Sequence, residues 1–121
     1  MNQDRTGRIY DLEDRTRTFA RDVRKFIRKI PKDLPNLEDA KQLVRASGSI
    51  GANYIEANEA LGKKDFIFRL KVSRKEAKEA RYWLGILDAG PDLDLQSLQR
   101  HLHQESDELM KIFGAIVRKL E

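Results

Sequence analysis

The sequence predicts an all-α protein, an antiparallel up-down-up-down four-helix bundle that occupies residues 1–121 as one domain. Three turn-forming stretches, at residues 31–36, 62–65 and 90–92, divide the chain into four segments of similar length. Apolar residues recur at steps of three and four within these segments, and no segment alternates with period two for long enough to indicate a strand. Because the connections are short, neighbouring helices are expected to run antiparallel.

The first helix is expected at about residues 12–30, with frayed residues before it. Its apolar residues lie on one helical stripe, which consists of Phe19, Val23, Phe26, Ile27 and Ile30. An amphipathic helix of this kind is expected to bury that stripe against the other helices.

The second helix is expected at about residues 37–61. Asn36 is a candidate N-cap, because its side chain can accept hydrogen bonds from the unpaired amides of the first turn. Gly62 can end the helix in the left-handed conformation. Gly48 and Gly51 lie in the middle of this helix, where each glycine costs about 1 kcal/mol relative to alanine. We therefore expect another helix to pack closely there, with a local hinge as the alternative.

The third and fourth helices are expected at about residues 65–89 and 94–120. Asp65 can cap the third helix, Gly90 and Pro91 end it, and Asp92 or Asp94 precedes the fourth. The fourth helix has the most regular apolar stripe of the chain, formed by Leu95, Leu98, Leu102, Leu109, Phe113, Ile116 and Leu120.

Composition and motifs argue against several classes of function. The absence of cysteine excludes disulfides, thiolate catalysis and cysteine-ligated zinc. No signal peptide is recognisable, and no stretch approaches the roughly 20 apolar residues of a membrane span, so a cytoplasmic protein with no membrane association is expected. His101 and His103 lie on different faces of a helix and are interpreted as surface residues. No catalytic, metal or cofactor motif is present, and an enzyme is not expected.

Basic residues are concentrated in the first and third helices, although the net charge is only +4. They form two stripes at spacings of three and four, one of Arg21, Arg24, Lys25, Arg28 and Lys32 and one of Lys71, Arg74, Lys75, Lys78 and Arg81. Such stripes can follow the phosphates of a nucleic acid, and they also occur on ordinary solvated helix faces. No aromatic residues are interleaved with them for stacking on bases.

A polar set on the second and third helices is expected to lie beside the core. It consists of Asn53, Glu56, Arg74, Glu76 and Glu79. We interpret it as an internal network that fixes helix register or a subunit contact, because buried charges are tolerated only when paired. A binding site is the alternative.

Four stretches carry a family resemblance: FIRKIP at residues 26–31, QLVRASGSIGANYIEANEA at 42–60, KKDFIFRLKVSRKEAKEARYWLGIL at 63–87 and ESDELMKIFGAIVRKL at 105–120. Over about residues 18–120 the chain resembles the four-helix-bundle proteins encoded in intervening sequences of bacterial 23S rRNA genes. It is also similar to the accessory protein of diversity-generating retroelements, a basic pentamer that works with a reverse transcriptase and nucleic acid. The resemblance implies an antiparallel bundle that assembles as a ring of five, with no assigned catalytic activity.

The family pattern is matched at positions that have no assigned role. These are Ser47, Ser49, Gly51, Asn53, Glu56, Asp65, Phe66, Arg74, Glu76, Glu79, Tyr82, Trp83 and Leu84. Two functions therefore stay open. The first is a homo-oligomer, expected to be a pentamer, that binds structured RNA or DNA by shape and phosphate. The second is a scaffold or adaptor that binds a protein partner.

Overall fold

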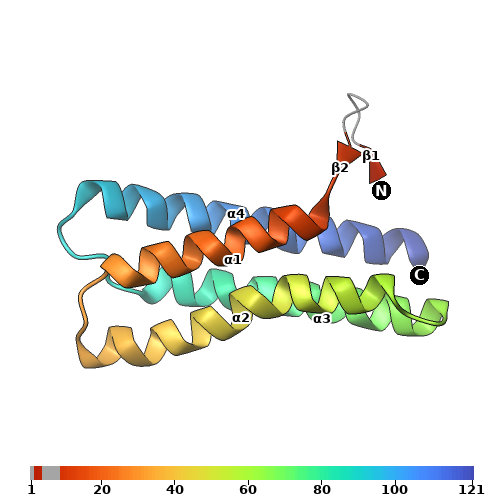
Figure 1. Ribbon diagram of the computed structural model, residues 1–121, viewed down its shortest axis with the longest axis horizontal. Helices are drawn as coiled ribbons and strands as arrows, with labels where there is room; N and C mark the ends of the chain where they lie inside the picture. Colours follow the sequence, from red (N-terminus) through yellow and green to blue (C-terminus); the bar gives the residue numbers. More distant parts are fainter. Residues whose placement is uncertain (1, 4–8) are drawn as a thin grey trace.

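The computed structural model describes residues 2–3 and 9–121, and four long helices make up nearly all of this part of the chain (Figure 1). They are α1 (Leu12–Lys29), α2 (Leu34–Asn58), α3 (Lys63–Ile86) and α4 (Leu93–Leu120). The prediction of an all-α protein with four helices is confirmed. No helix in the described residues is both long enough and apolar enough to cross a membrane.

A short pair of strands precedes α1. Strands β1 (Asn2–Gln3) and β2 (Ile9–Tyr10) pair antiparallel, with Asn2 opposite Tyr10. The sequence analysis predicted no strand, because two residues are too few to show an alternating pattern. The expectation of frayed residues before α1 falls partly on residues 1 and 4–8, which lie outside the described residues.

The helices lie side by side along their length (Figure 1). The α1–α2 and α3–α4 connections are at one end of the molecule, and the α2–α3 connection is at the other. Helix α2 packs against α1 and α3, and α4 packs against the same two helices. Within the described part of the chain the backbones of α1 and α3 do not come into contact, so these two helices occupy opposite corners.

The core forms where the apolar stripes of the four helices meet. Its fully buried large side chains are Leu12, Phe19, Val23, Phe26, Leu43, Ile50, Leu70, Leu84, Leu102, Leu109, Phe113 and Val117. The predicted stripes of the first and fourth helices contribute half of this set, since their spacing of three and four places them on one face of each helix.

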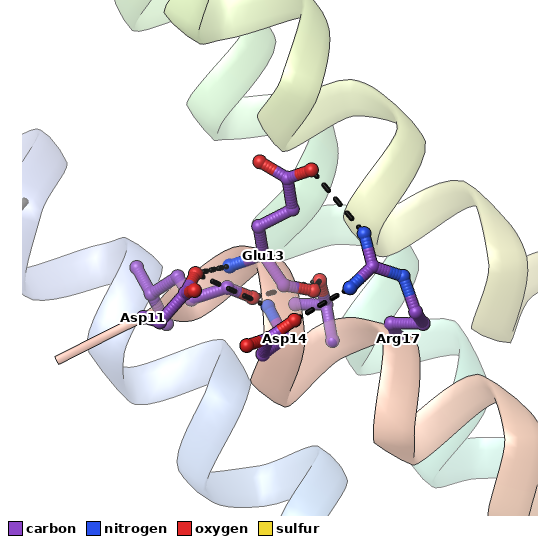
Figure 2. A network of polar contacts seen from close by, with 6 residues as sticks. Asp11, Glu13, Asp14 and Arg17 are labelled. Carbon is purple, nitrogen blue, oxygen red and sulfur yellow. Dashed lines mark hydrogen bonds and ion pairs between the residues drawn. The ribbon is translucent and has the colours of Figure 1, made fainter.

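Helix α1 begins with a polar network (Figure 2). One carboxylate oxygen of Asp11 accepts hydrogen bonds from the amides of Glu13 (3.0 Å) and Asp14 (3.2 Å), which satisfies two donors that the helix itself cannot pair. Arg17 forms ion pairs with Asp14 (2.5 Å) and Glu13 (3.3 Å). At the other end, the ammonium group of Lys32 donates to carbonyls of the last turn of α1. This basic residue of the first stripe is therefore a helix cap.

Helix α2 begins at Leu34, three residues before the predicted start. Its N-cap is Asp33, whose carboxylate accepts from the amide of Asn36 at 2.9 Å, so the prediction of Asn36 as the cap is wrong. Pro35 was interpreted as a breaker, but proline is tolerated in a first helical turn, where its missing N–H would have no partner.

The end of α2 and both ends of α3 also differ from the prediction. Helix α2 ends at Asn58, and Gly62 is the extended N-cap of α3, with φ of −158°, rather than a left-handed end of α2. Helix α3 therefore begins at Lys63, ahead of the predicted cap Asp65, and it ends at Ile86. The turn to α4 contains Gly90 in the left-handed region, with φ of 75°.

Candidate nucleic-acid interface

Six cationic side chains gather in a hollow between α3 and α4. A hollow of about 490 Å³, here called the basic hollow, is lined by Lys71, Arg74, Lys75, Lys78, Met110, Lys111, Gly114 and Arg118. Its lining includes six cationic side chains and no carboxylate among the described residues. Charges of one sign along a concave surface reinforce one another and attract an anionic ligand.

Only two of the six cations have a carboxylate partner in the described part of the chain. Lys71 lies 3.1 Å from a carboxylate oxygen of Glu121, and Lys111 lies 2.8 Å from Asp107. The other four form no ion pair there; they are Arg74, Lys75, Lys78 and Arg118. None of these four is held by an ion pair that a phosphate would first have to break, although the charge of Lys75 acts on the buried Glu76 and lowers its pKa.

Gly114 makes room for the two arginines of the basic hollow. A Cβ at this position would lie 3.3 Å from Nη1 of Arg118 and 3.5 Å from Cδ of Arg74. Because glycine carries only hydrogen there, both long side chains lie close to the α4 backbone. A larger residue at this position would have to displace one of these two side chains.

Arg81 was predicted to belong to the same basic stripe, but it is engaged elsewhere. Its Nη1 lies 2.6 Å from Oδ1 of Asp107, which joins α3 to α4. Hydrogen bonds from Lys111 and Arg81 lower the pKa of Asp107 below its ordinary value. The structure therefore places Arg81 in an interhelix ion pair.

The predicted basic residues of α1 lie apart from this hollow. Arg21, Lys25 and Arg28 are exposed, and Lys25 lies 3.9 Å from Asp22. Arg24 is partly buried against α2, where it donates to the carbonyl of Ala20 (2.9 Å) and the hydroxyl of Ser47 (3.3 Å). Since α1 and α3 occupy opposite corners, the two stripes do not form one continuous surface.

A second hollow lies between α2 and α3 and contains aromatic side chains. This aromatic hollow, also of about 490 Å³, is lined by Gln42, Arg45, Lys75, Lys78, Glu79, Tyr82 and Trp83. Tyr82 is 60% exposed and meets the Trp83 ring edge-on, with ring centroids 5.0 Å apart. Lys75 and Lys78 line both hollows, so the two form adjoining parts of one surface.

Aromatic residues also stand at both ends of the α3 stripe. Phe68, Lys71, Lys75, Lys78 and Tyr82 follow one another at steps of three and four, and Phe68 is 55% exposed. The sequence analysis found no aromatic residue interleaved with the basic stripes. No aromatic residue lies between these lysines, but the spacing places Phe68 and Tyr82 on the same helix face, one at each end of the stripe.

The predicted polar set is divided among four places. Glu76 and Glu79 both face Arg45 of α2, at 3.7 and 3.2 Å. Asn53 donates to the carbonyl and the hydroxyl of Ser49 and accepts from Arg69 at 3.2 Å. The remaining two members are separate, since Glu56 is exposed and Arg74 lines the basic hollow. The structure does not bring the five residues into one network.

Glu76 is the one buried carboxylate of the set, with 5% of its surface exposed. Its Oε2 has no hydrogen-bond partner within the described residues, and the nearest cation is the guanidinium of Arg45 at 3.7 Å. Burial raises the pKa of Glu76, and the negative charge of Glu79 raises it further, while Arg45 acts in the opposite direction. The negative charge of Glu76 is thus only partly compensated by the positive charge of Arg45.

The two histidines and the acidic residues do not form a metal site in the described part of the chain. His101 and His103 are exposed, as the sequence analysis expected. No group of three or more histidine, cysteine, aspartate or glutamate side chains lies close enough there to hold an ion.

Sequence reasoning missed the contributions of α2 and α4 to this surface. Lys111 and Arg118 lie seven residues apart on α4, a spacing that places them on one face of a helix. The signal was hidden because acidic residues balance the basic ones along α4, four against four. Arg45 lies on α2, outside both predicted stripes, and only the packing of α2 against α3 brings it to the aromatic hollow.

The chain is similar to known proteins over most of its length. Residues 10–115 match the model of a family described as 23S rRNA-intervening sequence protein. A crystal structure of a protein of unknown function from the S23 ribosomal protein family, from Bacteroides thetaiotaomicron, superimposes with a TM-score of 0.75 at 29% sequence identity. The match covers 88% of this chain and 98% of that one. No match is found among curated proteins.

Proposed function

Since the chain belongs to the 23S rRNA-intervening sequence protein family, we propose that it is a non-enzymatic, oligomeric protein that binds structured RNA or other nucleic acid. The basic surface centred on α3 is the proposed binding face, and the exposed arginines of α1 form a second, separate contact. Recognition is by phosphate position and helix shape, because no base-reading motif is present in the sequence.

One observation carries this proposal. The basic hollow gathers six cations from two helices and includes four with no carboxylate partner in the described residues. On α1, acids of the same helix pair with Arg17 and Lys25, whereas Arg21 and Arg28 are exposed and form no ion pair within the described residues. The basic hollow differs because its unpaired cations come from two helices and line one concave surface without a carboxylate, and this unbalanced charge favours an anionic partner.

Assembly would combine the weak positive charge of each copy into a large positive charge on one particle. A single copy has a net charge of +4, and five copies in a ring carry +20. In such a ring of up-down-up-down bundles, repeated basic hollows would bind one nucleic acid at several points, which raises avidity without new contacts. Exposed apolar side chains support self-association and include Leu34, Leu61, Phe68, Ile86 and Leu93.

The same exposed apolar residues favour a second candidate function, that of a scaffold or adaptor for another protein. The two functions differ in their response to salt. Phosphate contacts release counterions, so affinity for nucleic acid falls steeply as salt rises. Apolar contacts with a protein partner do not follow that dependence.

Charge reversal at two matched places tests the proposal. The variant Lys75→Glu with Lys78→Glu changes the basic hollow, and Arg21→Glu with Arg28→Glu makes the same change of charge on α1. All four residues are exposed, so both variants should fold. Binding of a labelled RNA hairpin, followed by fluorescence anisotropy over a salt series, should be lost mainly in the first variant. Its log–log salt slope should fall by about 0.7–0.9 for each lost phosphate contact.

Two results would contradict the proposal. Equal losses in both variants would show that net charge, and not the basic hollow, controls binding. A wild-type oligomer that binds neither RNA nor DNA at low salt would favour the scaffold function. Light scattering on the same samples measures the oligomer, and a monomer would remove the avidity argument.

A further inference from the structure

We propose that the aromatic hollow binds an unpaired nucleotide of the same nucleic acid whose phosphates lie in the basic hollow. The inference rests on the proposed function and narrows its ligand to nucleic acids in which an unpaired base lies beside a helical segment. Three observations support it: the contact between Tyr82 and Trp83, the excess of positive charge at the aromatic hollow, and the two lysines that line both hollows.

The aromatic pair supplies a platform for a base. Tyr82 is 60% exposed, and its ring is held by Trp83, which is itself packed against the core. A ring fixed in this way loses little freedom when a base stacks on it. Stacking tolerates any base, because every base presents a π face, and it is available only to bases outside a duplex.

The charges at the aromatic hollow favour a phosphate-bearing ligand. Three cations line it, and its single lining carboxylate, Glu79, is already met by Arg45 at 3.2 Å. Lys75 and Lys78 therefore remain available. A volume of about 490 Å³ falls within the roughly 300–1,000 Å³ of small-molecule sites.

The continuity of the two hollows fixes where the nucleotide would lie. Lys75 and Lys78 line both of them, so a phosphate held by these residues has the basic hollow on one side and the Tyr82 ring on the other. A strand that follows the α3 face would thus place the neighbouring base at the aromatic pair. A second copy of the chain would have to place carboxylates opposite both lysines to cover them, whereas a nucleic acid supplies the counter-charge with its phosphates.

Trp83 provides a direct measurement, because it is the only tryptophan of the chain. The probes are an RNA hairpin with an unpaired loop and a blunt RNA duplex with the same number of phosphates. We expect the hairpin to quench Trp83 emission and to bind about tenfold more tightly than the duplex, the factor that one stacked base provides. The duplex should bind through the basic hollow and leave the emission unchanged.

Three variants distinguish stacking on the Tyr82 ring from a nonspecific effect of substitution on RNA binding. Tyr82→Ala should reduce hairpin affinity to that of the duplex, and Tyr82→Phe, which keeps the ring, should restore it. Ile55→Ala removes an exposed apolar side chain from the hollow between α1 and α2. This control should change the affinity for neither the hairpin nor the duplex. Anisotropy measures binding in all cases, so that quenching and affinity are obtained separately.

The outcomes distinguish this inference from the proposed function. Equal affinity for hairpin and duplex, with Trp83 emission unchanged, would overturn the nucleotide site and leave nucleic-acid binding intact. No binding of either RNA would overturn both. If acrylamide quenches Trp83 far less in the free oligomer than in the monomer obtained by dilution, a second copy already covers the hollow, and the nucleotide site is likewise overturned.

Discussion

Gly51 of α2 faces Thr16 of α1 so closely that a Cβ on the glycine would lie 2.7 Å from the threonine Oγ1. That hydroxyl is held in place by its own hydrogen bonds to the carbonyls of Leu12 (2.8 Å) and Glu13 (3.1 Å). The close helix packing predicted from the two glycines of α2 is therefore confirmed, and the neighbouring helix is α1. Gly48 is different, because a Cβ there would lie 3.4 Å from the flexible end of Arg24.

This difference predicts opposite effects for one substitution made at the two glycines. Gly51→Ala should lower the free energy of unfolding by about 1–3 kcal/mol, since the new methyl group meets a fixed hydroxyl. Gly48→Ala should be neutral or raise it by up to about 1 kcal/mol, because alanine is the better helix former. Thermal melts measure both, and the double variant Gly51→Ala with Thr16→Ala should recover part of the loss. Equal stability of the two single variants would contradict the close approach.

How far the sequence predicts the fold can be judged from individual residues. The stripes of Phe19, Phe26, Leu102 and Leu109 lie in the core as expected, because helical spacing alone decides which residues share a face. The start of α2 was misplaced because Asn36 has the chemistry of a cap. In the structure the Asn36 side chain instead contacts Asp88 in the loop after α3. That contact depends on tertiary packing, which a local sequence pattern does not reveal.

The candidate site was predicted only in part for the same reason. Lys75 and Lys78 follow from spacing within α3. Lys111 lies beside them only because α4 packs against α3. Arg81 is bound by Asp107, a residue 26 positions away, and so does not line the basic hollow. Sequence reasoning identifies which residues share a helix face, and interhelix packing decides which faces meet.

Asn36 is the subject of the second prediction. Its side chain is 98% buried, donates to the carbonyls of Pro31 (2.9 Å) and Asp88 (2.7 Å), and accepts from the amide of Asp88 at 3.0 Å. Asn36→Ala should therefore lower the free energy of unfolding by about 1–3 kcal/mol, because buried polar groups lose their partners. Asn58→Ala, at an exposed position of the same helix, is the control for denaturant melts. A loss no larger than that of the control would show that the contact contributes little.

Glu76 gives a prediction about pH. Its pKa is raised above the ordinary value of 4.5 in the folded state, so the folded protein holds this proton more tightly than the unfolded chain. Its contribution to stability is then fully present below that ordinary value and is lost as pH rises through the raised pKa. Glu76→Gln should remove this fall, and at neutral pH it should be at least as stable as wild type.

The experiment for Glu76 is a series of urea melts from acidic to neutral pH. A Glu79→Gln variant, at a more exposed position facing the same Arg45, serves as the comparison. The sequence analysis placed Arg74 and Glu76 in one internal network, but Arg74 lies in the basic hollow and the cation near Glu76 is the exposed Arg45. A Glu76→Gln protein with an unchanged pH profile and lower neutral stability would refute the raised pKa.

Asp107 gives the last prediction, with the opposite sign. Its pKa is lowered by Lys111 and Arg81, so its contribution to stability is present above the ordinary value of 3.8 and is lost as pH falls through the lowered pKa. Asp107→Asn should therefore reduce stability at neutral pH and flatten the loss of stability in acid.

The same change frees Arg81 and Lys111, which Asp107 holds at 2.6 and 2.8 Å, beside the basic hollow. RNA affinity at low salt should rise while stability falls, a combination that simple unfolding cannot produce. Melts and anisotropy on one preparation test both, and a variant that loses stability and affinity together would show that Asp107 acts only by holding the helices in place.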